Sequence, residues 1–140
     1  MLVQEYFKTR SRLLEKALDQ YLAPSDKYPE QLHEAMRYSV FSGGKRMRPI
    51  LFFATYEMLI GRKNINRLSR LMPVACALEL VHTASLIHDD LPSVDNSSER
   101  RGIPSCHEKF GEATAILTGD ALITKAIELL TEVSNKKVAL

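Results

Sequence analysis

The sequence has no tryptophan, only two cysteines and no long uninterrupted apolar run. Cys76 and Cys106 are too few for a disulfide framework or a zinc site, so we expect two small buried thiols. The longest apolar runs, such as residues 50–55 and 78–81, fall well short of the roughly 18–20 residues that a membrane span needs. The N-terminal segment is amphipathic and lacks the features of a signal peptide. These absences predict a cytoplasmic protein without membrane insertion.

An excess of charge of either sign is also absent. Nineteen Lys and Arg residues stand against 17 Asp and Glu residues, and the net charge is +2. The basic residues are dispersed apart from two short clusters, at residues 45–48 and 100–101, so nothing indicates a nucleic acid partner. With 140 residues, 45% of them hydrophobic, the chain is long enough to bury a core, and we expect one domain spanning residues 1–140.

Helical periodicity runs through most of the chain, and no segment has a convincing strand pattern. We predict helices over residues 3–22, 49–60 and 112–133, a second helix that opens at Pro29 and is stopped by Gly43 and Gly44, and a fourth with Pro73 at an early position that runs to residue 91. A capping box of Ser105 and Glu108 should open a further short turn of helix. Gly61 ends the third helix, and residues 62–70 form a connection. The fourth helix is apolar on nearly all sides and should be central in a helical bundle. The predicted fold class is all-α.

Three aspartates gather where the fourth helix ends. Asp89 and Asp90 lie on its last turn, Asp95 comes just beyond, and Arg100 and Arg101 follow. Each carboxylate at a helix C-terminus costs a few tenths of a kcal/mol to about 1 kcal/mol, so a positive partner is expected. Mg²⁺ usually binds through one or two carboxylates together with substrate phosphates, and guanidinium groups suit the same phosphates. The alternative is a solvated acidic turn with its own salt bridges.

A second candidate site is a glycine-rich basic loop between the second and third helices. Gly43 and Gly44 are followed by Lys45, Arg46 and Arg48, just before a helix start that favours anions. His82 lies two helical turns before Asp89 and therefore on the same face of the fourth helix. The alternatives are a glycine helix cap with exposed basic residues, and a core histidine.

These elements together resemble the trans-isoprenyl diphosphate synthases, the family of farnesyl and geranylgeranyl diphosphate synthases. Residues 89–95 resemble the first aspartate-rich motif, residues 44–49 the Gly-Lys-x-x-Arg-Pro element, and residues 110–112 and 119–122 two further motifs. The likeness runs from about residue 32 to about residue 130. It implies the N-terminal half of an isoprenoid synthase fold.

The resemblance implies a prenyltransferase that condenses isopentenyl diphosphate with an allylic diphosphate. Asp89 and Asp95, supported by Asp90, would hold Mg²⁺, and Arg100 would contact the allylic diphosphate. The residues that would bind the diphosphate of isopentenyl diphosphate are Lys45, Arg48, His82 and Arg101.

The resemblance also implies a hydrophobic tunnel along the fourth helix, past Ser85, Ala84 and Val81. Ala84 stands five residues before the first aspartate, where farnesyl synthases of the bacterial type carry an aromatic residue. The smaller side chain predicts a product longer than farnesyl, with geranylgeranyl favoured.

The chain departs from the family in lacking a second aspartate-rich motif, which the family carries in its C-terminal half. We therefore expect one of three things: a fragment of a full synthase, a chain that completes its site by self-association, most simply as a homodimer, or a non-catalytic partner subunit. The last is an interaction protein instead of an enzyme.

Overall fold

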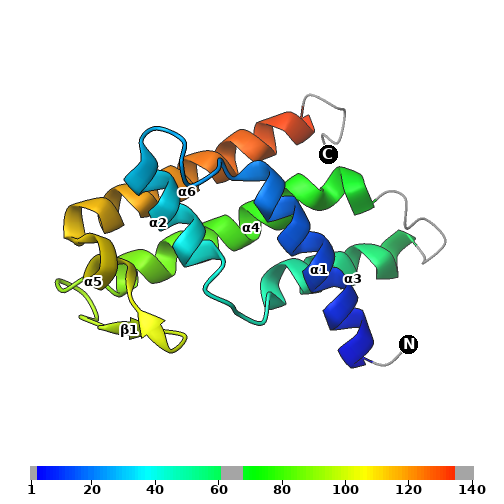
Figure 1. Cartoon of the computed structure of the whole chain (residues 1–140). Coiled ribbons are helices and arrows are strands. Elements are labelled where there is room, and N and C mark those ends of the chain that lie inside the picture. The colour runs from blue at the N-terminus through cyan, green and yellow to red at the C-terminus, as the bar shows by residue number, and fades with distance from the viewer. Residues whose placement is uncertain (1–2, 61–67, 135–140) are drawn as a thin grey trace. The chain divides into compact units, whose positions relative to one another are not determined.

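The computed structural model describes residues 3–60 and 68–134, and it is helical apart from one short hairpin (Figure 1). In chain order the elements are α1 (Val3–Tyr21), α2 (Glu30–Val40), α3 (Met47–Ile60), α4 (Leu68–Asp89), β1 (Glu99–Arg100), β2 (Ile103–Pro104), α5 (Cys106–Phe110) and α6 (Glu112–Ser134). The predicted all-α class is therefore confirmed. The contacts divide the chain into two compact units.

The first unit consists of residues 1–21, 45–79 and 126–140. In this unit α1 contacts α3, and the apolar positions spaced three and four apart in these helices supply its core. Its most deeply buried side chains include Leu14, Leu18, Ile50, Phe53 and Leu129. A buried ion pair also joins α1 to α3, because Arg10 Nη2 lies 2.7 Å from Glu57 Oε1.

The second unit consists of residues 22–44 and 80–125 and contains the hairpin. Here α2 packs against α5, with the rings of Tyr38 and Phe110 meeting edge to face at a centroid distance of 5.3 Å. The Tyr38 hydroxyl donates a hydrogen bond of 2.9 Å to the carbonyl of Pro104, which attaches the hairpin to α2. Completely buried apolar side chains of this unit include Ala35, Val40, Leu80, Ala84, Ala115 and Leu122.

The hairpin corrects the prediction that the chain has no strand. Glu99 pairs with Pro104 and Arg100 with Ile103, in antiparallel register. Two-residue strands are too short to show a period of two, so no sequence pattern announced them. The predicted capping box is also wrong, because Ser105 makes no side-chain cap. Its Oγ instead lies 3.0 Å from His107 Nδ1.

Two helix boundaries also differ from the prediction. Helix α4 begins at Leu68, so residues 68–70, which were predicted as part of the connection, are helical, and Pro73 lies early in the helix as expected. Leu68 and Leu71 are buried and hold the extra turn in place. Helix α2 ends at Val40, before Gly43 and Gly44. The predicted cap at Gly61 and most of the predicted connection lie outside the described residues.

Among the described helices, α4 has the length and apolar composition that a membrane span requires. Of its most apolar window, however, 56% is buried inside the protein, which is typical of a core helix.

Candidate functional site

The backbone that follows α4 folds back over the end of the helix. The last carbonyls of a helix have no hydrogen-bond donor within the helix, and here backbone amides of the loop donate to them. The Asp95 amide donates to the Asp89 carbonyl at 2.9 Å, and the Ser97 amide donates to the Asp90 carbonyl at 3.1 Å. The structure therefore brings Asp89 and Asp95 together, and both residues are exposed.

The hairpin then turns the two arginines in different directions. Its two-residue loop is Arg101–Gly102, with φ values of 57° and 79°. Positive φ at both positions is what a type I′ turn requires, and Gly102 suits the second of them. Arg100 lies in β1 and Arg101 lies in the turn, so their side chains reach different partners.

Arg100 forms a two-pronged ion pair with Asp90. Its Nε lies 3.1 Å from Oδ1 and 3.0 Å from Oδ2 of Asp90, and its Nη2 also donates to Oδ1. The Asp90 side chain is 2% exposed, whereas that of Arg100 is 36% exposed. The hydrogen bonds that Arg100 donates to Asp90 raise the pKa of Arg100, and the negative charges of Asp90, Asp95 and Asp89 add to this effect. The guanidinium therefore stays charged and is held against the Asp90 carboxylate.

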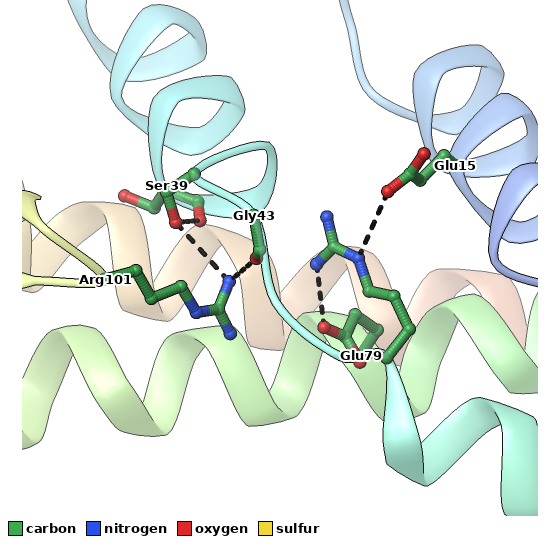
Figure 2. A network of polar contacts seen from close by, with 7 residues as sticks. Glu15, Ser39, Gly43, Glu79 and Arg101 are labelled. Atoms are coloured by element: carbon green, nitrogen blue, oxygen red, sulfur yellow. Dashed lines mark hydrogen bonds and ion pairs between the residues drawn. The ribbon is translucent and has the colours of Figure 1, made fainter. Parts of the chain in front are cut away.

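Arg101 extends over the glycine loop, as Figure 2 shows for Arg101 and Gly43. Its Nη1 donates to the Gly43 carbonyl and lies 3.4 Å from Ser42 Oγ. A Cβ atom on Gly44 would come within 2.8 Å of the Arg101 guanidinium carbon. Gly44 is thus needed at this position both for its φ of 128° and for the close approach of Arg101.

Arg46 does not belong to an exposed basic cluster, which corrects the grouping of this residue with Lys45 and Arg48. Its side chain is 1% exposed, and Nη1 lies 2.8 Å from Glu79 Oε1. Nε lies 3.8 Å from Glu15 Oε1, so Arg46 joins both carboxylates, as the dashed lines from Glu15 and Glu79 show (Figure 2). Lys45 and Arg48, in the same unit, are exposed. A sequence gives no direct signal for which of three neighbouring cations is buried.

The face of α4 that carries Asp89 also carries Val81 and Ser85, which are exposed, and His82, which is partly exposed. Ala84, in contrast, has no exposed surface. In the described part of the chain, Val81 and Ser85 are therefore at the surface of α4 and Ala84 is not.

A cleft lies on another side of α4, between that helix, the hairpin and the end of α2. Thr83 and Asp90 line it, about 160° and 100° around the helix from Ser85 and Asp89 respectively, since successive residues are about 100° apart. The Thr83 hydroxyl is buried there and makes no hydrogen bond within the described residues. The other lining residues are Tyr38, Ser39, Ser42, Leu86, Ile87, Arg100, Arg101, Ile103, Pro104, Ser105 and Cys106.

Sequence reasoning missed the role of His88, which precedes the aspartates. Its Nε2 lies 3.1 Å from the Ile116 carbonyl oxygen and 3.9 Å from Asp120 Oδ1, on α6. A Cβ atom on Gly119 would overlap Nε2 at 2.1 Å, so the glycine makes room for the ring. Asp120 is thus a polar contact between helices. The signal available in the sequence was Gly119, because a glycine inside a helical pattern often has a packing reason.

The two cysteines are free and buried, as predicted. Burial raises the pKa of the Cys76 thiol to about 12 and raises that of Cys106. Both thiols are therefore poor nucleophiles at neutral pH.

The donor set at the end of α4 fits a metal ion that is shared with a substrate. Among the described residues, no group of three or more His, Cys, Asp or Glu side chains is placed to enclose a metal. Asp89 and Asp95 nevertheless offer two exposed carboxylates beside a cationic side chain. Mg²⁺ is commonly held by one or two carboxylates plus substrate phosphates, and this donor set suits that arrangement.

A helical protein with two exposed carboxylates and an arginine–aspartate ion pair at the end of a core helix has groups that suit a divalent metal and a phosphorylated ligand. Comparison with known families is more specific, because the polyprenyl synthetase family matches residues 29–140. The chain belongs to this family.

The relatives are prenyl diphosphate synthases. The large subunit 1 of a chloroplastic heterodimeric geranylgeranyl pyrophosphate synthase from Arabidopsis thaliana is 47% identical over 133 residues, which are 95% of this chain and 34% of that protein. Farnesyl diphosphate synthase from Geobacillus stearothermophilus is 43% identical over 136 residues, which are 97% of this chain and 44% of that protein.

Solved structures agree with these sequence relatives. A geranyltransferase from Legionella pneumophila superposes with a TM-score of 0.82 at 42% identity, over 91% of this chain and 43% of that one. Geranyltranstransferase from Thermotoga maritima gives a TM-score of 0.80 at 40% identity, over 94% of this chain and 47% of that one. The chain therefore matches part of an isoprenoid synthase fold and spans between about a third and a half of the length of these relatives.

Proposed function

We propose that this chain carries the first metal motif and the isopentenyl diphosphate site of a trans-prenyltransferase of isoprenoid biosynthesis. The observation that carries the proposal is that exposed Asp89 and Asp95 meet at the end of α4, next to the ion pair of Asp90 and Arg100, in a chain of the polyprenyl synthetase family. Relatives named farnesyl and geranylgeranyl synthases support this reaction class.

In this proposal Asp89 and Asp95 hold Mg²⁺, and Arg100 binds the allylic diphosphate. The diphosphate of isopentenyl diphosphate is bound by Lys45, Arg48, His82 and Arg101. When bound, Mg²⁺ neutralises the negative charge that develops on the allylic diphosphate as its carbon–oxygen bond ionises. Arg100 contributes fixed positive charge to the same allylic diphosphate, since guanidinium and phosphate pair in a two-pronged geometry.

The prenyl chain runs, in this proposal, along the α4 face that carries Val81 and Ser85. Both side chains are small, so they leave room beside the helix, and we expect a product longer than farnesyl. Because Ala84 is completely buried, it influences product length through the packing behind this face.

A second proposal is that the chain is catalytically incomplete alone and acts as part of, or as a partner subunit of, a longer synthase. Two observations favour it. The chain spans only part of its relatives, and α6 carries large exposed apolar side chains such as Leu117 and Ile127. Surfaces of this kind commonly serve as interfaces between proteins.

One experiment separates the two proposals. The purified chain is incubated with Mg²⁺, isopentenyl diphosphate and geranyl or farnesyl diphosphate, and the prenyl products are identified by mass spectrometry. Turnover that Asp89→Ala abolishes would support an active enzyme, and the product length would test the prediction for the α4 face. A folded chain that binds both diphosphates without turnover would support the incomplete or partner form. A folded chain that binds neither contradicts both.

A further inference from the structure

We propose that Asp90 is a positioning residue for Arg100 and not a ligand of the metal. The inference rests on the proposed function and deepens it, because it assigns different tasks to the two adjacent aspartates. Asp89 presents its carboxylate to solvent, whereas Asp90 is 2% exposed and directs its carboxylate at Arg100.

The hydrogen bonds of Asp90 leave little capacity for a metal. Both of its carboxylate oxygens accept hydrogen bonds from Arg100, and Oδ1 accepts two of them. Its backbone is fixed at both ends as well, because its amide donates to Leu86 and its carbonyl accepts from Ser97. A metal ion at Asp90 would have to displace a charged group from a buried carboxylate, which is strongly unfavourable.

The same hydrogen bonds orient Arg100 toward its proposed ligand. They engage Nε and Nη2, while the side chain remains 36% exposed. Its partner Asp90 directly follows Asp89, and the Asp95 amide is hydrogen-bonded to the Asp89 carbonyl at 2.9 Å. The exposed part of the guanidinium therefore lies beside the proposed metal ligands, where a diphosphate that bridges metal and arginine would bind. Because Asp90 already holds the Arg100 guanidinium in place, binding of the diphosphate does not have to order this side chain.

The consequence is a separation of effects between the two aspartates. Loss of Asp90 should weaken binding of the allylic diphosphate without changing the requirement for Mg²⁺. Loss of Asp89 should raise the Mg²⁺ requirement. The Asp90 effect should also act through Arg100, so it should disappear when Arg100 is already absent.

The test measures binding of geranyl diphosphate by isothermal titration calorimetry over a series of Mg²⁺ concentrations. The variants are Asp90→Asn, Asp89→Asn, Arg100→Gln and the double variant Asp90→Asn/Arg100→Gln, compared at a temperature where circular dichroism shows each to be folded. We expect Asp90→Asn to weaken binding about tenfold or more with an unchanged half-saturating Mg²⁺ concentration. We expect the double variant to bind no more weakly than Arg100→Gln alone.

Other outcomes overturn the inference. If Asp90→Asn raises the half-saturating Mg²⁺ concentration as Asp89→Asn does, Asp90 is a metal ligand. If the effects of Asp90→Asn and Arg100→Gln add, Asp90 acts independently of Arg100. If Asp90→Asn does not fold, Arg100→Lys provides the second variant: it keeps the charge but loses the fork, and unchanged binding by it would contradict the positioning role. No binding of geranyl diphosphate by the native chain would instead overturn the proposed function itself, and the inference with it.

Discussion

Arg100 and Arg101 are neighbours in the sequence but contact different parts of their unit. Arg100 pairs with Asp90 at the end of α4, whereas Arg101 contacts the glycine loop that follows α2. The type I′ turn separates them, since one arginine lies in the strand and the other in the loop. Two adjacent cations are thereby directed at two different places, which suits a reaction that binds two diphosphates.

Substitution of Gly44 tests the contact between Arg101 and the glycine loop. We expect Gly44→Ala to displace the Arg101 guanidinium, because the new Cβ would meet it at 2.8–2.9 Å. The displaced Arg101 should then lose its proposed charge-assisted hydrogen bond to the diphosphate of isopentenyl diphosphate. We expect binding of isopentenyl diphosphate, measured by calorimetry, to weaken about tenfold. Both this change and Gly43→Ala should also cost about 1–3 kcal/mol of stability for alanine at positive φ.

Gly43→Ala is the matched control, because a Cβ at that position meets no atom within 4 Å. It shares the backbone strain of Gly44→Ala without the overlap with Arg101. Equal binding by the two variants would show that the position of Arg101 does not depend on Gly44.

Much of the site was visible at the residue scale in the sequence, and part of it was not. The spacing of Asp89, Asp95 and the two arginines indicated a cluster; in the structure the Asp95 amide bonds to the Asp89 carbonyl, and Arg100 pairs with Asp90. The sequence could not show which charges are buried. Arg46 and Asp90 have the same residue types as their exposed neighbours, and tertiary packing alone decides that each forms an internal ion pair.

At the scale of elements, helix periodicity located α1, α3 and α6 to within two residues at each described end. The start of α4 and the hairpin could not be predicted from helix periodicity. Helix α4 extends beyond Pro73 because Leu68 and Leu71 are buried, and the hairpin forms because a two-residue turn and the Tyr38 hydroxyl hold it. Each of these depends on a partner distant in sequence, which local patterns do not report.

The contact of α4 with α6 depends on Gly119. We expect Gly119→Ala to destabilise the chain by about 1–3 kcal/mol in urea denaturation, because the new Cβ would overlap His88 Nε2. Removal of the ring should relieve the overlap. In a His88→Ala background, Gly119→Ala should therefore lower the free energy of unfolding by clearly less. If the losses from the two substitutions simply add, Gly119 does not act by making room for the ring.

At the scale of the whole molecule, apolar surface on α6 is a feature that the described residues leave unexplained. Its exposed apolar residues are Ile116, Leu117, Ile123, Ile127 and Leu130. Helix α6 thus resembles a core helix with one face uncovered. This observation supports the predicted self-association, in which a second copy of the chain covers α6.

We therefore expect the chain to sediment as a dimer or larger species whose population rises with concentration. Replacing Ile116 and Ile123 with lysine should shift it to a monomer, because burying two lysines in an apolar interface is strongly unfavourable. Glu132→Lys is the matched control: it lies on the same helix and changes the net charge by the same +2, but at an exposed polar position. Sedimentation velocity over a range of concentrations measures the change. If the native chain is monomeric at all concentrations, or if Glu132→Lys dissociates it equally well, the apolar face of α6 is not the interface.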